Sequence, residues 1–283
     1  MGYGAYSGAS RRTRATSMGY TTKSAREIFS RNFDSRMNPH GVDMRESRDS
    51  DDHPLSLPII VALDVTGSMG HIPHYLVREG LPNIIEGIIN EGIADPQMLF
   101  MGIGDHEVDR APLQVGQFES SDELMDQWLT SLWIESGGGG NDGESYLLAW
   151  YFASRYTHHD HLDKRGNRGL LFTVGDEPTL RNLPARAQQS IMGEGQYQDR
   201  TAQQLLEDAR EKYDCYHLHV LQGHNGSRQD VKDGWEQLMG DHLIQVQNQN
   251  QVVSVIVNKV IEVARSQDTF QPASENRFDN LEI

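Results

Sequence analysis

The sequence has little cysteine, few basic residues for its acidity and no long apolar run. Its one cysteine, Cys215, excludes an internal disulfide framework and is typical of a reducing compartment. Lys and Arg number 25 against 41 Asp and Glu, which gives a formal net charge of −16. We therefore expect no general binding to nucleic acid, because the neutralisation of phosphates requires clustered basic side chains.

Membrane attachment is also not expected from the sequence. No apolar run reaches the roughly 18 residues that a membrane-spanning helix needs. The first residues lack the apolar stretch of a secretory signal, and Tyr6 stands where an N-terminal acylation pattern has Ser or Thr. The sequence thus predicts a cytoplasmic protein.

Charge is distributed unevenly along the chain. Residues 1–50 hold nine basic and five acidic side chains, a balance of +4 that leaves −20 for the rest. We predict a basic, largely extended or disordered N-terminal arm at 1–56, a domain at 57–265 and a flexible tail at 266–283. The arm is either solvated or lies on an acidic surface, and that surface belongs to its own domain or to a neighbouring subunit.

The segment 57–265 alternates between strand and helix patterns. Apolar runs that are typical of buried strands occur at 58–63, 97–103, 169–174 and 215–221, with shorter strands expected at 112–118 and 242–246. Helical spacing predicts helices at 76–90, 121–133, 144–156, 201–213, 231–239 and 252–264. This order predicts an α/β fold with a doubly wound, mostly parallel sheet flanked by helices and one short antiparallel edge strand.

Oxygen-bearing side chains gather where these strands end. Asp64, Thr66 and Ser68 follow the first strand, Asp176 follows the strand at 169–174, and a glycine-rich loop before a helix ends in Asn141 and Asp142. Ligands of such sheets bind beyond the carboxyl ends of the strands. Carboxylate and hydroxyl oxygens without Cys or His favour Mg²⁺, with Ca²⁺ or Mn²⁺ as alternatives, over zinc. Asp105, after the second strand, is predicted to have a supporting role.

These residues resemble a known family. Asp64-Val-Thr66-Gly-Ser68 is similar to the D-x-S-x-S motif of the von Willebrand factor A (VWA) fold and its metal-ion-dependent adhesion site (MIDAS), with one Ser replaced by Thr. Asp176 stands where that family has its final Asp. The segment 138–145 resembles the G-G-G-D-x-P-E variant of VWA domains in alpha-kinase-type and many bacterial proteins, and in that register either Asn141 or Asp142 takes the ligand position. The resemblance covers roughly 57–265.

The resemblance implies a binding protein rather than an enzyme. Thr66 and Ser68 would coordinate Mg²⁺ directly, Asp64 and Asp176 would hold metal-bound waters, and a protein partner would present an Asp or Glu to the ion. Bacterial proteins of this kind often work beside MoxR-type AAA+ ATPases, which makes such an ATPase a predicted partner. Two alternatives stay open: a metal-dependent phosphoester hydrolase with His71, His106 or Glu177 as base, and an assembly subunit whose arm links protomers.

Other histidines are weaker candidates. The run His158-His-Asp-His161 could bind a transition metal, but its polar surroundings favour a solvated loop. His217 and His219 share one face of a predicted strand and are expected to be packed rather than ligating. Cys215 has no identifiable catalytic partner.

Overall fold

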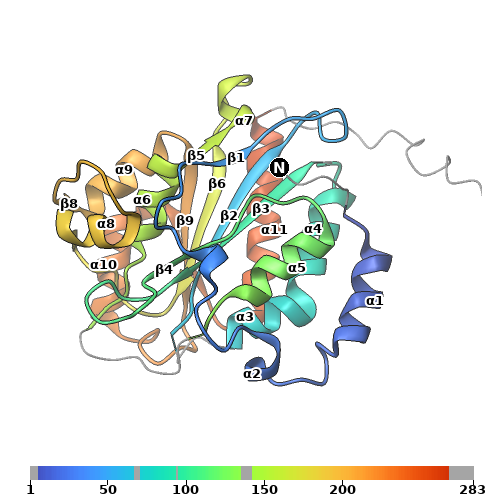
Figure 1. Cartoon of the computed structure of the whole chain (residues 1–283), viewed down its shortest axis with the longest axis horizontal. Coiled ribbons are helices and arrows are strands. Elements are labelled where there is room, and N and C mark those ends of the chain that lie inside the picture. The colour runs from blue at the N-terminus through green and yellow to red at the C-terminus, as the bar shows by residue number, and fades with distance from the viewer. Residues whose placement is uncertain (1–5, 67–70, 94, 135–141, 268–283) are drawn as a thin grey trace, which may run out of the picture.

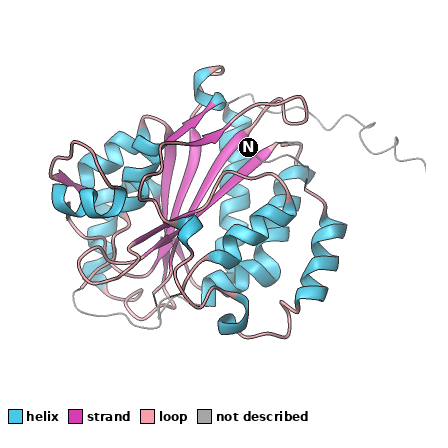
Figure 2. Cartoon of the chain, in the orientation of Figure 1, coloured by secondary structure: helices cyan, strands magenta, loops and turns pink. Residues whose placement is uncertain are grey.

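A six-stranded sheet forms the centre of the computed structural model, which describes residues 6–66, 71–93, 95–134 and 142–267. The strand order is β10-β9-β6-β2-β3-β4 (Figures 1 and 2), and all neighbours are parallel except β4, which is antiparallel to β3. The strands are β2 (Leu57–Asp64), β3 (Pro96–Ile103), β4 (Leu113–Val115), β6 (Gly169–Gly175), β9 (Tyr213–Val220) and β10 (Leu243–Val246). The predicted fold class, including the short antiparallel edge strand, is confirmed.

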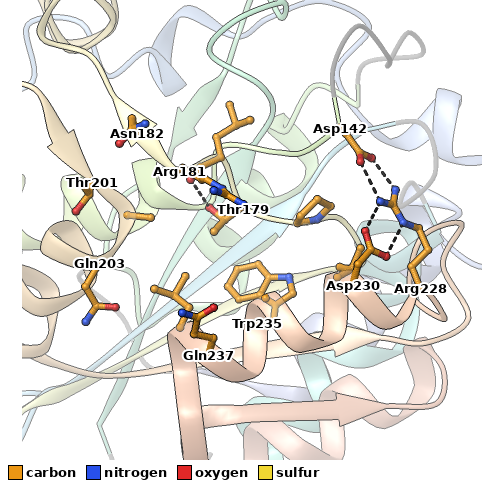
Figure 3. Close-up of a pocket in the computed structure, with 16 residues that line it drawn as sticks. Asp142, Thr179, Arg181, Asn182, Thr201, Gln203, Arg228, Asp230, Trp235 and Gln237 are labelled. Carbon is orange, nitrogen blue, oxygen red and sulfur yellow. Dashed lines mark hydrogen bonds and ion pairs between the residues drawn. The ribbon is translucent and has the colours of Figure 1, made fainter.

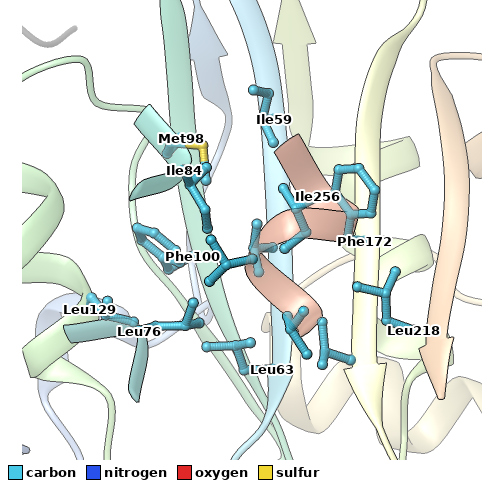
Figure 4. Packing of buried hydrophobic residues seen from close by; sticks show 14 of the residues in the cluster. Ile59, Leu63, Leu76, Ile84, Met98, Phe100, Leu129, Phe172, Leu218 and Ile256 are labelled. Atoms are coloured by element: carbon cyan, nitrogen blue, oxygen red, sulfur yellow. The ribbon is translucent and has the colours of Figure 1, made fainter. Parts of the chain in front are cut away.

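Helices cover both faces of this sheet (Figure 1), because alternate residues of the strands point to opposite sides. Along β2, Ile59 and Val61 belong to one apolar cluster, whereas Ile60 and Ala62 belong to the other. Figure 4 shows the first cluster, in which Ile256 packs among side chains of the sheet. The first face carries α3 (His71–Tyr75), a π-helical turn (Leu76–Gly80), α4 (Leu81–Asn90), α5 (Asp122–Ser131) and α11 (Gln249–Ser266); the second carries α6 (Leu147–Tyr156), α8 (Ala185–Met192), α9 (Ala202–Arg210) and α10 (Gln229–Met239). None of the described helices is long and apolar enough to span a membrane.

Several short elements had no counterpart in the sequence prediction. Elements of two to five residues contain too few side chains for a periodic pattern to show. They are α3 (His71–Tyr75), a 3-10 turn (Ser35–Met37), β1 (Arg45–Ser47), β5 (Thr157–His159), α7 (Asp160–Asp163), β7 (Asn182–Leu183), β8 (Arg200–Thr201) and a second 3-10 turn (Gly240–His242). Helix α2 (Ala25–Ile28), by contrast, lies within 24–33, where apolar side chains on one side favour a short helix.

The described part of the N-terminal arm differs from the extended segment that its composition suggested. Residues Gly8–Met18 form helix α1, in which the Ser10 amide donates to the side chain of the cap residue Ser7. Arg11 is 1% exposed, and its Nε lies 2.7 Å from Asp126 Oδ1 on α5. Arg14 Nη1 lies 2.6 Å from Asp122 Oδ2 on the same helix. These are the contacts of a basic arm on an acidic surface of its own chain. Its role in linking protomers stays a prediction, and residues 268–283 of the predicted tail lie outside the described residues.

The prediction of a solvated loop at the histidine run was wrong. Residues 157–159 form β5, which pairs in parallel with β1 of the arm, and both His159 and His161 are buried. His159 Nδ1 accepts a hydrogen bond from the Leu162 amide at 3.1 Å and so caps α7. Arg48 of the arm reaches Asp160 at 2.7 Å. The local sequence is polar, but a segment more than a hundred residues away covers it.

Candidate functional site

Main-chain hydrogen bonds tie together three loops at the carboxyl end of the sheet. The Ser145 amide donates to the Gly104 carbonyl, after β3, at 3.0 Å. The Glu144 amide donates to the Pro178 carbonyl, after β6, at 2.9 Å, and Leu180 returns a bond to the Glu144 carbonyl. Residues 142–146 therefore lie between the loops that follow β3 and β6, and these loops converge at the carboxyl edge of the sheet.

Asp64 is the last residue of β2, and its side chain is completely buried. Its Oδ1 accepts bonds from the Thr66 amide at 2.9 Å and from Thr66 Oγ1 at 2.6 Å. Its Oδ2 accepts a bond from the Tyr146 hydroxyl at 2.9 Å. The carboxyl is thus fixed against the Thr66 hydroxyl, while Ser68, the third residue of the motif, lies outside the described residues.

Asp176 follows β6 and is also fully buried. Its Oδ2 accepts a bond from the Asn225 amide at 2.9 Å, whereas its Oδ1 has no hydrogen-bond partner among the described residues. Gly223 lets the loop after β9 approach, because a Cβ at that position would overlap the Asp176 carboxyl. One oxygen of a buried carboxyl is left without a partner at this edge of the sheet.

Glu144 belongs to the same group of buried carboxyls, and sequence reasoning missed it. Its Oε2 has no hydrogen-bond partner among the described residues, and the same holds for Asp105 Oδ2. The sequence pattern placed Glu144 at the start of a helix, but α6 begins at Leu147, so both Glu144 and Tyr146 belong to the preceding loop. A carboxylate directly after a glycine-rich loop was the signal that could have identified it.

Burial raises the pKa of Asp64, Glu144 and Asp176 above their ordinary values. Mutual repulsion adds to this, because the charge of Asp176 raises the pKa of Asp64 and that of Asp64 raises the pKa of Glu144. None of the three forms an ion pair with a Lys or Arg of the described residues. Buried carboxylates are usually paired or bound to a metal. A divalent cation would offset both burial and repulsion here.

The donor set fits a hard cation in part. Carboxylate oxygens and the Thr66 hydroxyl are of the type that Mg²⁺ and Ca²⁺ prefer. Within the described residues, no three His, Cys, Asp or Glu side chains form a metal-ligand cluster. A site of the predicted kind would depend on hydroxyl oxygens instead, and two of its predicted ligands, Ser68 and Asn141, lie outside the described residues.

Asp142, unlike the buried carboxyls, is exposed and paired with an arginine. Its side chain is 65% exposed and accepts two bonds from Arg228, from Nη1 at 2.7 Å and from Nη2 at 2.9 Å (Figure 3). The hydrogen bond from Arg228 lowers the pKa of Asp142. Arg228 also binds Asp230 at 2.6 Å. In this arrangement Asp142 is engaged by a guanidinium, and its role as a metal ligand stays a prediction.

Aromatic packing fixes the Tyr146 side chain that holds Asp64. His217 stacks on Trp235 with ring centroids 3.4 Å apart, and Tyr146 lies edge-on to both rings. His217 Nδ1 lies 2.9 Å from Thr173 Oγ1, and burial lowers the pKa of His217 well below its ordinary value. The prediction that His217 is packed is confirmed, and its packing positions Tyr146.

No family model and no curated protein is significantly similar to the chain. Among solved structures, the pilus adhesin SpaC from Lactobacillus rhamnosus GG in its open conformation is 11% identical, with a TM-score of 0.49 over 75% of this chain and 30% of the adhesin chain. Another crystal structure of SpaC is 13% identical, with a TM-score of 0.48 over 75% and 31% of the two chains. Proximal thread matrix protein 1 from the mussel byssus is 12% identical, with a TM-score of 0.46 over 78% and 49%. The chain thus spans less than half the length of these proteins, and the distant likeness says nothing of what it binds.

Proposed function

We propose that this chain is a VWA-like binding module that uses a divalent cation, Mg²⁺ in the first instance, to capture a carboxylate of a protein partner. The observation that supports this most is the group of buried carboxyls at one sheet edge, Asp64, Asp176 and Glu144, which lack basic partners among the described residues and leave oxygens without hydrogen bonds. Bound there, the cation would supply positive charge and an open position for an anionic ligand.

The residues at this site would have different roles in binding the cation. The Thr66 hydroxyl and, by the sequence motif, Ser68 would contact the cation, and Asp64 and Asp176 would balance its charge. Tyr146 orients Asp64 through the 2.9 Å hydrogen bond. Because hydroxyl ligands carry no charge, the cation keeps affinity for an Asp or Glu from outside. A MoxR-type AAA+ ATPase and a cytoplasmic location remain predictions of the sequence resemblance.

Calorimetric titration with Mg²⁺ tests the proposal directly. Wild type should bind one ion, and Asp64→Asn should lower the affinity by at least tenfold. Because burial disfavours the charged form of Asp64, the variant without metal should be no less stable than wild type without metal. Mg²⁺ at one hundred times its dissociation constant should stabilise wild type by about 2.7 kcal/mol, which is roughly 5–10 °C in the melting midpoint.

Asp233→Asn is a matched control, because it removes an exposed carboxylate on α10 and should leave Mg²⁺ affinity unchanged. If Asp64→Asn binds Mg²⁺, Ca²⁺ and Mn²⁺ as tightly as wild type, the site assignment is wrong. Turnover of phosphoesters by wild type that Asp64→Asn abolishes would instead support the hydrolase.

A further inference from the structure

A groove adjoins the candidate metal site. It has a volume of about 910 Å³ and lies between the loop after β6, the start of α9 and one side of α10 (Figure 3). The end nearest the site is formed by Asp142, Arg228 and Pro178, and Pro178 stands two residues after Asp176. We infer that this groove binds an extended segment of the protein partner, with an acidic side chain of that segment at the metal end. This inference rests on the proposed function.

The lining of the groove is suited to a peptide. Its floor includes Leu180 and Trp235, and Trp235 is held in place by a 2.9 Å hydrogen bond from its indole nitrogen to the Glu177 carbonyl. Away from the metal end, Asn182, Thr201 and Gln203 line the groove (Figure 3). Amides and hydroxyls both donate and accept hydrogen bonds, as the main chain of an extended peptide requires, and the apolar floor suits its side chains.

The groove is less acidic than the protein as a whole, so it suits an acidic segment better than the rest of the surface does. Two arginines, Arg181 and Arg228, and two aspartates, Asp142 and Asp230, line it, so its formal charge is zero in a chain of −16. Arg228 is neutralised by both aspartates. Arg181 is exposed and forms no ion pair with the other described residues. A guanidinium in that state attracts a carboxylate of the bound segment.

Gly234 gives an independent indication that something approaches the groove. It lies in the middle of α10, where glycine is a much poorer helix former than alanine. A Cβ at this position would meet no atom within 4 Å, so packing inside the chain does not require glycine. Gly234 lines the groove, and its bare backbone leaves space for a ligand to approach closely.

A displayed library of 12-residue peptides, each with one fixed Asp among random positions, tests the inference. The library is selected on wild type in Mg²⁺ and eluted first with EDTA and then with acid, and enriched peptides from both eluates are measured on variants. Gly234→Leu should fill the groove and lower peptide affinity at least tenfold, with Mg²⁺ affinity unchanged. Its melting midpoint should not fall, because leucine is the better helix former. Gln229→Leu, on exposed α10 surface outside the groove, is the matched control and should bind as wild type does.

Failure of the groove and failure of the metal site give different results. Absence of enriched peptides from both eluates, or equal binding to Gly234→Leu and wild type, overturns the groove. Binding that is lost in Asp64→Asn but retained in Gly234→Leu supports the metal site and refutes the groove. Binding lost in Gly234→Leu but retained in Asp64→Asn supports a peptide groove and overturns carboxylate capture by the cation.

Discussion

Replacing Arg11 by Met tests whether one buried charge pair holds the N-terminal helix on the domain. The side chains of Arg11 and Asp126 are 1% and 2% exposed, so the variant leaves a carboxylate buried without its main partner. Loss of one partner of a buried pair costs about 3–5 kcal/mol. Arg14 Nη1 remains 3.6 Å from Asp126 Oδ2, so we expect the lower end, about 3 kcal/mol at pH 8.

The stability that Arg11→Met loses should depend on pH and should be larger at higher pH. Burial raises the pKa of Asp126 to about 6, above its ordinary value of 3.8, even though the charge of Arg11 lowers it. The native state therefore holds this proton more tightly than the unfolded state, and stability falls as pH rises between the two pKa values. Without Arg11 the pKa of Asp126 in the native state is higher still. Above pH 6, wild type therefore stops losing stability through Asp126, whereas the variant continues to lose about 1.4 kcal/mol per pH unit. The difference from wild type should be about 2 kcal/mol larger at pH 8 than at pH 5.

Urea unfolding at both pH values, followed by tryptophan fluorescence, measures these differences. Arg12→Met is the matched control, because Arg12 stands on the same helix, is 68% exposed and pairs with the half-exposed Glu86 at 3.1 Å, which is worth about 0–1 kcal/mol. Arg11→Met combined with Asp126→Leu should recover most of the loss. If Arg11→Met costs no more than Arg12→Met, or costs the same at pH 5 and pH 8, the reasoning is refuted.

Three further substitutions test other parts of the structure. Burial lowers the pKa of His159 to about 3. Below pH 6.5 the unfolded state therefore binds a proton at His159 more readily than the native state does. The free energy of unfolding then falls by about 1.4 kcal/mol for each pH unit of acidification. His159→Asn keeps an acceptor for the Leu162 amide without titrating, and should flatten the urea-measured stability between pH 6.5 and 4; an unchanged slope would contradict this. Gly175→Ala places a Cβ 2.6 Å from Cζ of the Tyr146 ring and should destabilise the protein by about 1–3 kcal/mol. Gly234→Ala meets no atom within 4 Å and should stabilise the protein by up to about 1 kcal/mol, because alanine is the better helix former. Equal midpoints in thermal unfolding would refute the contrast.

Much of the fold was predictable because its signals are local. The run at 58–63 is apolar on both faces, and β2 is buried on both faces. Asp64, Thr66 and Asp176 could be located because they stand at the end of a strand or just after it, and parallel strands end at one edge. The sequence left Asn141 and Asp142 as alternative ligands, and no local pattern indicated that Arg228 binds Asp142.

The sequence by itself determined the order of strands and helices, and hence the sheet edge at which the candidate site lies. Only the tertiary structure decided that α1 docks on α5, that His159 is buried, and that Tyr146 holds Asp64 from 82 residues away. The spacing of apolar residues along the chain indicates which face of a helix or strand is apolar, because the residues of that face are close together in the sequence. A buried pair such as Arg11 and Asp126 leaves no such pattern, because each member is an ordinary polar residue until packing removes water from both.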